Sequence, residues 1–149
     1  MGEVTDTAGR QIYAARRPDR IASGAGFVFV YSISSKSSFT LIHPQIKASP
    51  SYPGSSTSSS PMPIMIIGNK SDEVTAREVS TKEGNALAKE LGCMFVEVSA
   101  KDNTKVKEVF LEMMRQLKIR RGNGRNLQQP TENLGRRILQ WLKKKISWA

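Results

Sequence analysis

The chain has 149 residues, a single cysteine and a formal net charge of +10. This length allows one domain with a hydrophobic core and is short for two. A single cysteine excludes an intramolecular disulfide framework and fits a reducing compartment. No apolar run approaches the roughly 20 residues that span a bilayer, and no secretory signal is visible. The positive excess lies largely after Arg115. We therefore expect a soluble, intracellular chain that does not bind nucleic acid.

The first candidate motif is Asp6-Thr7-Ala8-Gly9, preceded by Glu3 and Val4. A carboxylate that ends a strand suits a contact to a magnesium-bound water. A glycine three residues later allows the backbone to approach a terminal phosphate closely. Asp6 and Gly9 are therefore candidate residues for magnesium and phosphate.

Two segments follow that differ sharply in composition. Gly26 to Ile33 is a continuous apolar, β-branched and aromatic run, which is typical of a strand buried on both faces. Ala48 to Pro63 is a Ser- and Pro-rich insertion. We expect it to be a disordered surface loop that buries no apolar surface.

Strands and helices then alternate. Pro63 to Gly68 and Cys93 to Val98 are further apolar runs. Between them, Ser80 and Glu83 have capping-box spacing, and Gly92 is expected to end the helix that they begin. A second helix is expected from Thr104 to Ile119. Its apolar face comprises Val106, Val109, Phe110, Met113, Met114 and Leu117. The alternation predicts an α/β fold with a parallel sheet and right-handed crossovers.

Polar motifs follow two of these strands, where ligands bind in doubly wound sheets. Asp72 can accept hydrogen bonds from the ring N–H and the exocyclic amine of guanine. Asn69 can fix the loop and reach the purine edge, and the stem of Lys70 can lie over the ring. Ser99-Ala100-Lys101 follows the next strand, where the Ala100 N–H could donate to the guanine carbonyl. Either motif alone is weak, but together they favour a guanine-binding site.

These motifs, with GFVFVYSISSKSSF and EVSTKEGNALAKELGCMFVEVSAK, resemble a Ras-family small GTPase over about residues 3–119. The Ser/Pro insertion is similar to that in Ras-like proteins of filamentous fungi. The resemblance implies a sheet of the P-loop NTPase type, GTP or GDP with Mg²⁺, and GTP hydrolysis in a signalling switch. It also implies exchange factors, GTPase-activating proteins, effectors and the cytoplasmic face of the plasma membrane. By position it assigns the guanine site to Asn69, Lys70, Asp72, Ser99, Ala100 and Lys101, and the magnesium and phosphate site to Asp6 and Gly9.

The sequence departs from that family in its phosphate site. The family binds phosphates with G-x-x-x-x-G-K-[ST], and these 149 residues contain no Gly-Lys pair. We therefore expect a partial sheet that lacks the first strand, phosphate loop and first helix. This would leave Gly26 to Ile33 with an unpaired apolar edge. Arg10 stands where the family has the glutamine that orients the attacking water, and arginine only donates.

Further departures lie in the helices. Pro18 falls inside the expected switch helix, where proline costs about 3 kcal/mol. The segment from Phe39 to Ile46 is three residues shorter than in the family and contains Pro44, so its helix should be shortened or broken. We expect a GTPase that is impaired as it stands. The alternative is a non-enzymatic remnant or interaction module without nucleotide turnover.

The chain is expected to divide into a Ras-like domain, residues 1–121, and a basic flexible tail, residues 122–149. Family members usually end in a prenylated C-a-a-X box, whereas Ile146 to Ala149 contains no cysteine. This favours a cytosolic location. The amphipathic tail has two interpretations. It is either a weak anchor on anionic membrane, at about 1 kcal/mol per basic residue, or an accidental pattern.

Overall fold

The computed structural model describes residues 25–49, 52 and 62–120. Several expectations fall outside these residues. They are the roles of Asp6, Gly9 and Arg10, the effect of Pro18, most of the Ser/Pro insertion and the tail from residue 122. None of the described helices is long and apolar enough to cross a membrane.

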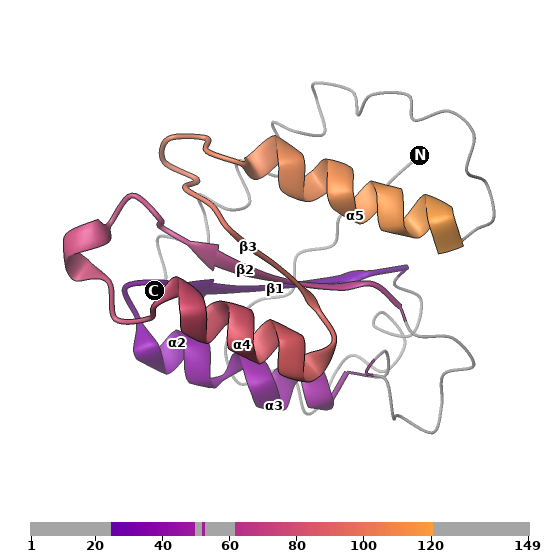
Figure 1. The fold of residues 1–149 in the computed structure, drawn as a ribbon, viewed down its shortest axis with the longest axis horizontal. Coiled ribbons are helices and arrows are strands. Elements are labelled where there is room, and N and C mark those ends of the chain that lie inside the picture. The colour runs from indigo at the N-terminus through magenta and orange to yellow at the C-terminus, as the bar shows by residue number, and fades with distance from the viewer. Residues whose placement is uncertain (1–24, 50–51, 53–61, 121–149) are drawn as a thin grey trace, which may run out of the picture.

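Three parallel strands form the sheet of the described region (Figure 1). They are β1 (Phe27–Ser32), β2 (Ile64–Asn69) and β3 (Met94–Glu97), in the order β1-β2-β3. Phe27 is level with Ile64, and Met65 is level with Met94. The expectation of an α/β fold with a parallel sheet is confirmed.

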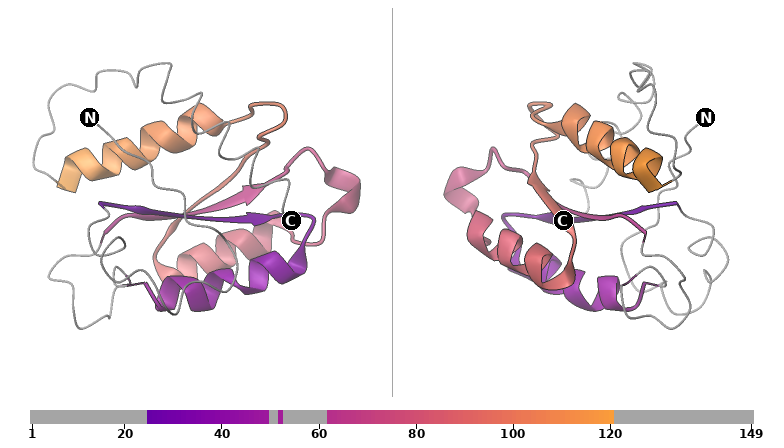
Figure 2. Two further views of the ribbon diagram at one scale, coloured as in Figure 1. Left: turned by 180° about the vertical axis from the view of Figure 1, so that it is seen from behind. Right: turned by 45° about the vertical axis from the view of Figure 1, so that its right-hand side comes forward.

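Helices cover both faces of this sheet. Helices α2 (Lys36–Thr40), α3 (Ile42–Lys47) and α4 (Thr81–Leu91) lie on one face, and α5 (Val106–Arg120) lies on the other (Figures 1 and 2). A short 3₁₀ helix, η1 (Val74–Ala76), stands beyond the carboxyl ends of the strands. Because side chains alternate along a strand, each strand contributes to two separate cores.

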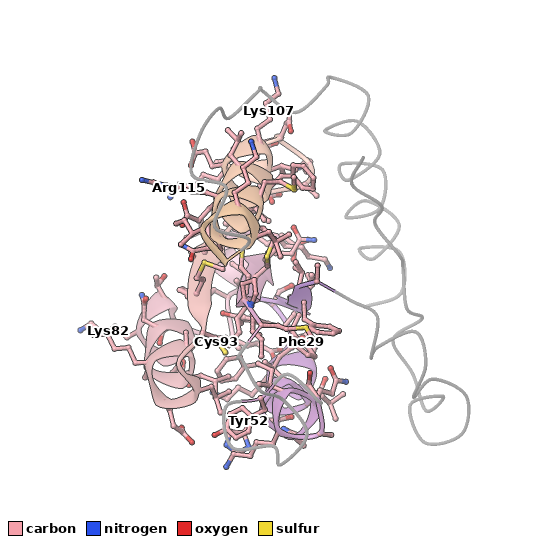
Figure 3. The ribbon with its side chains drawn as sticks, turned by 90° about the vertical axis from the view of Figure 1, so that its right-hand side faces the viewer. Phe29, Tyr52, Lys82, Cys93, Lys107 and Arg115 are labelled. Carbon is pink, nitrogen blue, oxygen red and sulfur yellow. The ribbon has the colours of Figure 1, made fainter. Side chains whose placement is uncertain are left out.

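The core under α2, α3 and α4 includes Tyr31, Ile66 and Leu91. Phe29 and Cys93 pack against its edge, where Figure 3 shows them between the sheet and the helices. Tyr52 also packs there, although it belongs to the Ser/Pro insertion. The expectation that the insertion buries no apolar surface is therefore wrong at this residue.

The core under α5 contains buried side chains from the other face of the sheet and from the helix. Figure 3 shows Lys107 and Arg115 of the same helix pointing away from the sheet. The buried residues are Met65, Ile67, Val98, Ala100, Val106, Val109 and Met113. The predicted apolar face of this helix therefore packs as expected at three of its six positions, with Phe110 and Leu117 partly buried beside them.

The two outer strands of the described sheet are less buried than the central one. Every residue of β2 is buried, since it has a neighbouring strand on each side. In β1 only Tyr31 and Ser32 are buried, and Val28 is 38% exposed. The prediction that this strand is buried on both faces is therefore wrong along its first half. The physical reason is that β1 is an edge strand of the sheet that the structure describes.

Local sequence explains where the helices begin and end. The Ser80 hydroxyl accepts from the Glu83 N–H and the Glu83 carboxylate accepts from the Ser80 N–H, which is the predicted capping box. Gly92 ends the helix with φ at 65°. The break between α2 and α3 falls at Leu41, because Pro44 has no N–H to donate to the Thr40 carbonyl.

Helix α5 begins two residues later than predicted, at Val106. Thr104 instead pairs with Ser99, the Thr104 N–H donating to the Ser99 carbonyl at 3.0 Å. Asn103 and Lys105 both have a positive φ of 57°, which is incompatible with a helix. The loop that follows β3 is therefore closed by the pairing of Ser99 with Thr104, and the helix begins only after this pair.

Candidate functional site

Two loops at the carboxyl edge of the sheet carry the residues singled out in the sequence. The first begins at Asn69, the last residue of β2. The second follows β3 and contains Ser99, Ala100 and Lys101. Because β2 and β3 are parallel neighbours, both loops leave the sheet at the same edge (Figure 1). The Ser71 N–H donates to the Val98 carbonyl at 3.0 Å and joins the loops directly.

The buried side chain of Asn69 connects the two loops by hydrogen bonds. Asn69 is only 3% exposed. Its Oδ1 accepts from the Lys70 N–H at 2.8 Å and from the Ala100 N–H at 3.3 Å. Since buried amide groups require partners, this side chain satisfies backbone donors from both loops at once. It therefore holds the loops in a fixed relation to each other.

Lys70 turns the chain sharply at the end of the strand. Its φ is 66°, in the left-handed region that non-glycine residues rarely adopt. The hydrogen bond to Asn69 offsets part of that cost. The Lys70 ammonium lies 3.8 Å from the Glu73 carboxylate, and its side chain is 15% exposed. The aliphatic stem is therefore packed along the loop while the charged end has a carboxylate partner.

Asp72 presents the only carboxylate that contacts both predicted motifs within the described region. Its Oδ1 accepts from the Ser99 hydroxyl at 2.6 Å, and its Oδ2 lies 4.0 Å from the Lys101 ammonium. The Ser99 hydrogen bond holds the pKa of Asp72 below its usual value, with smaller contributions from Lys101 and Lys70. The side chain is 17% exposed. Asp72 is therefore ionised at neutral pH and acts only as an acceptor.

Ser99 organises the second loop as well as orienting Asp72. Its Oγ accepts from the Asp102 N–H at 3.1 Å while donating to Asp72. Ser99 is 1% exposed and Ala100 is fully buried, whereas the Lys101 side chain is 77% exposed. The structure thus brings all six residues of the predicted guanine site to one edge of the sheet, in different environments.

Two contacts at this edge were not anticipated from the sequence. The Arg77 guanidinium pairs with both carboxylate oxygens of Glu97, at 2.8 and 3.0 Å. The Ser34 hydroxyl donates to Glu73 at 2.6 Å. The partners lie 20 and 39 residues apart, so no local spacing could have signalled them. An ion pair between a loop and the neighbouring strand, such as Arg77–Glu97, becomes recognisable only once the order of the strands in the sheet is known.

The magnesium and terminal-phosphate residues are not in this geometry. Asp6 and Gly9 lie outside the described residues, as does Arg10. Across residues 25–49, 52 and 62–120, no group of three His, Cys, Asp or Glu side chains is arranged to hold a metal ion. The six residues of the predicted guanine site supply one carboxylate, one hydroxyl, two ammonium groups, and side-chain and backbone amides.

Known proteins match this chain over most of its length. A family model described as the Ras family matches residues 2–119. Protein ras-2 of Neurospora crassa is 52% identical over 141 residues, covering 85% of this chain and 62% of that protein. Ras-like protein 1 of Pyricularia oryzae is 53% identical, covering 81% of this chain and 56% of that protein. Ras-like protein B of Aspergillus fumigatus is 46% identical, with 81% and 59% covered. The chain therefore spans about three fifths of the length of these relatives.

Proposed function

The chain belongs to the Ras family of small GTPases, and from this premise we propose that Asp72 and the loops around it bind the guanine base of GTP or GDP. The observation that carries the proposal is the position of Asp72. It is an ionised carboxylate with its Oδ1 held by Ser99, in a loop fixed by Asn69. The loops on both sides of it are joined to each other.

The carboxylate has acceptor capacity left for a base. Two carboxylate oxygens offer about four lone-pair sites. Ser99 uses one of them, and Lys101 lies at 4.0 Å from the other oxygen. The Watson–Crick edge of guanine presents a ring N–H and an amine, both donors. Adenine presents a ring nitrogen acceptor at the corresponding position, so a carboxylate discriminates against it.

The remaining residues would surround the ring. The aliphatic stem of Lys70 would cover one face of the base. The ion pair between the Lys70 ammonium and Glu73 would keep the stem in that position. The Ala100 N–H would donate to the guanine carbonyl. In this structure that N–H donates to Asn69 at 3.3 Å, a long hydrogen bond. Base binding would therefore share or replace it.

The phosphates would be held far less well by these 149 residues. The sequence contains no Gly-Lys pair that could form the family's phosphate loop. We therefore propose that this polypeptide binds the guanine base weakly, in the millimolar range. Fluorescent GDP should show no detectable binding at micromolar concentration. Saturable micromolar binding that GTP and not ATP competes away would refute this.

Base recognition is best tested by NMR at millimolar ligand. Amide spectra of the labelled chain should shift around Ser71, Asp72 and Ala100 on addition of GMP and stay unchanged with AMP. The Asp72→Asn variant should lose the response. Glu78→Gln is the matched control, since the Glu78 carboxylate accepts from the Lys36 N–H and not from any of the six site residues. Equal shifts with GMP and AMP would contradict guanine recognition.

For the whole protein we propose the family's activity, a signalling switch that binds GTP or GDP with Mg²⁺ and hydrolyses GTP. A second candidate is an interaction module without turnover. It is favoured by Arg10, which by resemblance occupies the position of the water-orienting glutamine and cannot accept a hydrogen bond from water. Phosphate release from GTP separates the two. Release above background by the wild-type chain at millimolar GTP and Mg²⁺ would support the switch, and release that stays at background under these conditions would support the interaction module.

A further inference from the structure

The guanine-recognition loop, residues 70–79, is attached near both of its ends to β3 and the residues that follow it. At its start, Ser71 and Asp72 bond to Val98 and Ser99. At its far end, beyond η1, Arg77 pairs with Glu97. All three partners belong to β3 or its immediate continuation. The loop is therefore bonded at two separate places to the same short segment, residues 97–99.

The Arg77–Glu97 pair has the geometry of a strong contact. Two hydrogen bonds of 2.8 and 3.0 Å join two guanidinium nitrogens to the two carboxylate oxygens, one to each. Their side chains are only 24% and 14% exposed. Arg77 also donates to the Val79 carbonyl at 3.1 Å, and Thr81 donates to Glu97 at 3.1 Å. Glu97 is thus held by donors from both the loop and the start of α4.

Glu97 lies close to both motifs of the site, the one that begins at Asn69 and the one that begins at Ser99. In the sheet register it is level with Gly68, the residue before Asn69. Along the chain it is two residues before Ser99. A displacement of Glu97 relative to the loop therefore changes the spacing of Asp72 and Ser99.

Other contacts fasten the same loop to the two residues that follow β1 and not to β3. The Glu78 and Val79 N–H groups both donate to the Ile33 carbonyl, at 2.8 and 3.0 Å. Ser34 donates to Glu73. These bonds do not involve Arg77. Without the Arg77–Glu97 pair the far end of the loop would stay bonded to the residues after β1, and only the contacts of Ser71 and Asp72 would hold the loop to the continuation of β3.

We propose that Arg77 and Glu97 are a positioning pair that fixes the spacing of Asp72 and Ser99 and thereby sets the selectivity for guanine. This rests on the proposed function. Neither residue is expected to touch the base. Small errors in the placement of binding groups, of about 0.5 Å, are enough to weaken a site whose supporting contacts are lost.

The test compares Arg77→Met with the wild-type chain by NMR at millimolar nucleotide. GMP affinity should fall about tenfold, which is about 1.4 kcal/mol. Affinity for IMP, which lacks the amine that Asp72 would accept from, should fall less, so the GMP/IMP ratio shrinks. Arg77→Lys keeps the charge and loses the two-pronged contact. It should behave like Arg77→Met and covers the case in which that variant does not fold. An Arg77→Glu, Glu97→Arg double variant should restore part of the ratio.

Lys36→Met is the matched control. Lys36 pairs with Glu83 and so also joins α4 to a distant segment, but it makes no contact with β3 or its continuation. This variant should leave the GMP/IMP ratio unchanged. If Arg77→Met also leaves it unchanged while the wild-type chain binds GMP, the positioning role is wrong and the proposed function stands.

A second readout needs no nucleotide. The pKa of the Asp72 carboxyl, followed by NMR titration, should rise in both Arg77 variants as Ser99 moves away, and should stay constant in Lys36→Met. A wild-type chain that does not bind GMP would refute the proposed function, and this titration would still decide the positioning role. An unchanged Asp72 pKa in a folded Arg77→Met variant would overturn it.

Discussion

Gly84 lies in α4 where no side chain has room, and Gly84→Ala should destabilise the domain. A Cβ at this position would stand 2.6 Å from Phe95 Cε2 and 2.7 Å from the Tyr31 hydroxyl oxygen. Favourable contacts between carbon atoms lie at about 3.5–4.0 Å, so helix and sheet would have to separate by about 1 Å. Overpacking of this kind costs about 1–3 kcal/mol.

The helix itself would gain from the same substitution. Alanine is about 1 kcal/mol more favourable than glycine in a helix interior. With two rigid neighbours the packing cost falls at the upper end of its range, so the free energy of unfolding should drop by about 2 kcal/mol. For a domain of this size that lowers Tm by very roughly 8–16 °C. Urea unfolding followed by far-UV circular dichroism measures the change.

Two companion variants isolate the cause. Ala86→Gly lies on the exposed face of the same helix and measures the propensity term alone, at about 1 kcal/mol of destabilisation. Phe95→Leu removes the ring atoms that the new Cβ would meet. Combined with Gly84→Ala it should cost less than the sum of the two single variants. A Gly84→Ala chain as stable as wild type would refute the packing argument.

Three further substitutions test other parts of the structure. Gly92→Ala places a side chain at a φ of 65° with open space around it, so it should cost about 1 kcal/mol in urea unfolding through backbone strain alone. Tyr31→Phe removes a buried hydroxyl that has no hydrogen-bond partner among the described residues, so it should stabilise the chain by about 1 kcal/mol, and a clear loss of stability would contradict this reasoning. Ser99→Ala should raise the pKa of Asp72 toward its ordinary value, as followed by NMR titration. Because the folded pKa is lowered, the stabilisation is present above about pH 4 and is lost as the pH falls through the folded value, so the stability deficit of Ser99→Ala should shrink in acid.

The elements whose ends are set by local chemistry were predictable from the sequence. Ser80 and Glu83 form the capping box that their spacing indicates, and Gly92 ends the helix in the left-handed conformation. Pro44 breaks the preceding helix, since it removes one backbone donor. These features depend on residues within one or two turns of each other.

What depended on neighbours in space was not predictable. The burial of β1 was overestimated because the apolar pattern does not say which strands lie at an edge, and Val28 is exposed for that reason. Helix α5 starts late because Thr104 pairs across the loop with Ser99. The backbone positions of Asn103 and Lys105 follow from that pairing.

The candidate site also has a part that could be predicted from the sequence and a part that could not. The motifs at Asn69 and Ser99 could be located from the strands that precede them. Their mutual contacts, and the Arg77–Glu97 pair that supports them, join residues separated by 20 or more positions. Only the sheet order and register bring such residues together.

The most direct test of guanine recognition exchanges the hydrogen-bonding character of residue 72. Asp72→Asn replaces a carboxylate by an amide that donates as well as accepts. Xanthine carries a carbonyl where guanine carries its amine. The variant should therefore lose the NMR response to GMP and gain one to XMP, with the wild-type chain showing the opposite preference. If Asp72→Asn still prefers GMP, Asp72 does not read the base and the central claim is wrong.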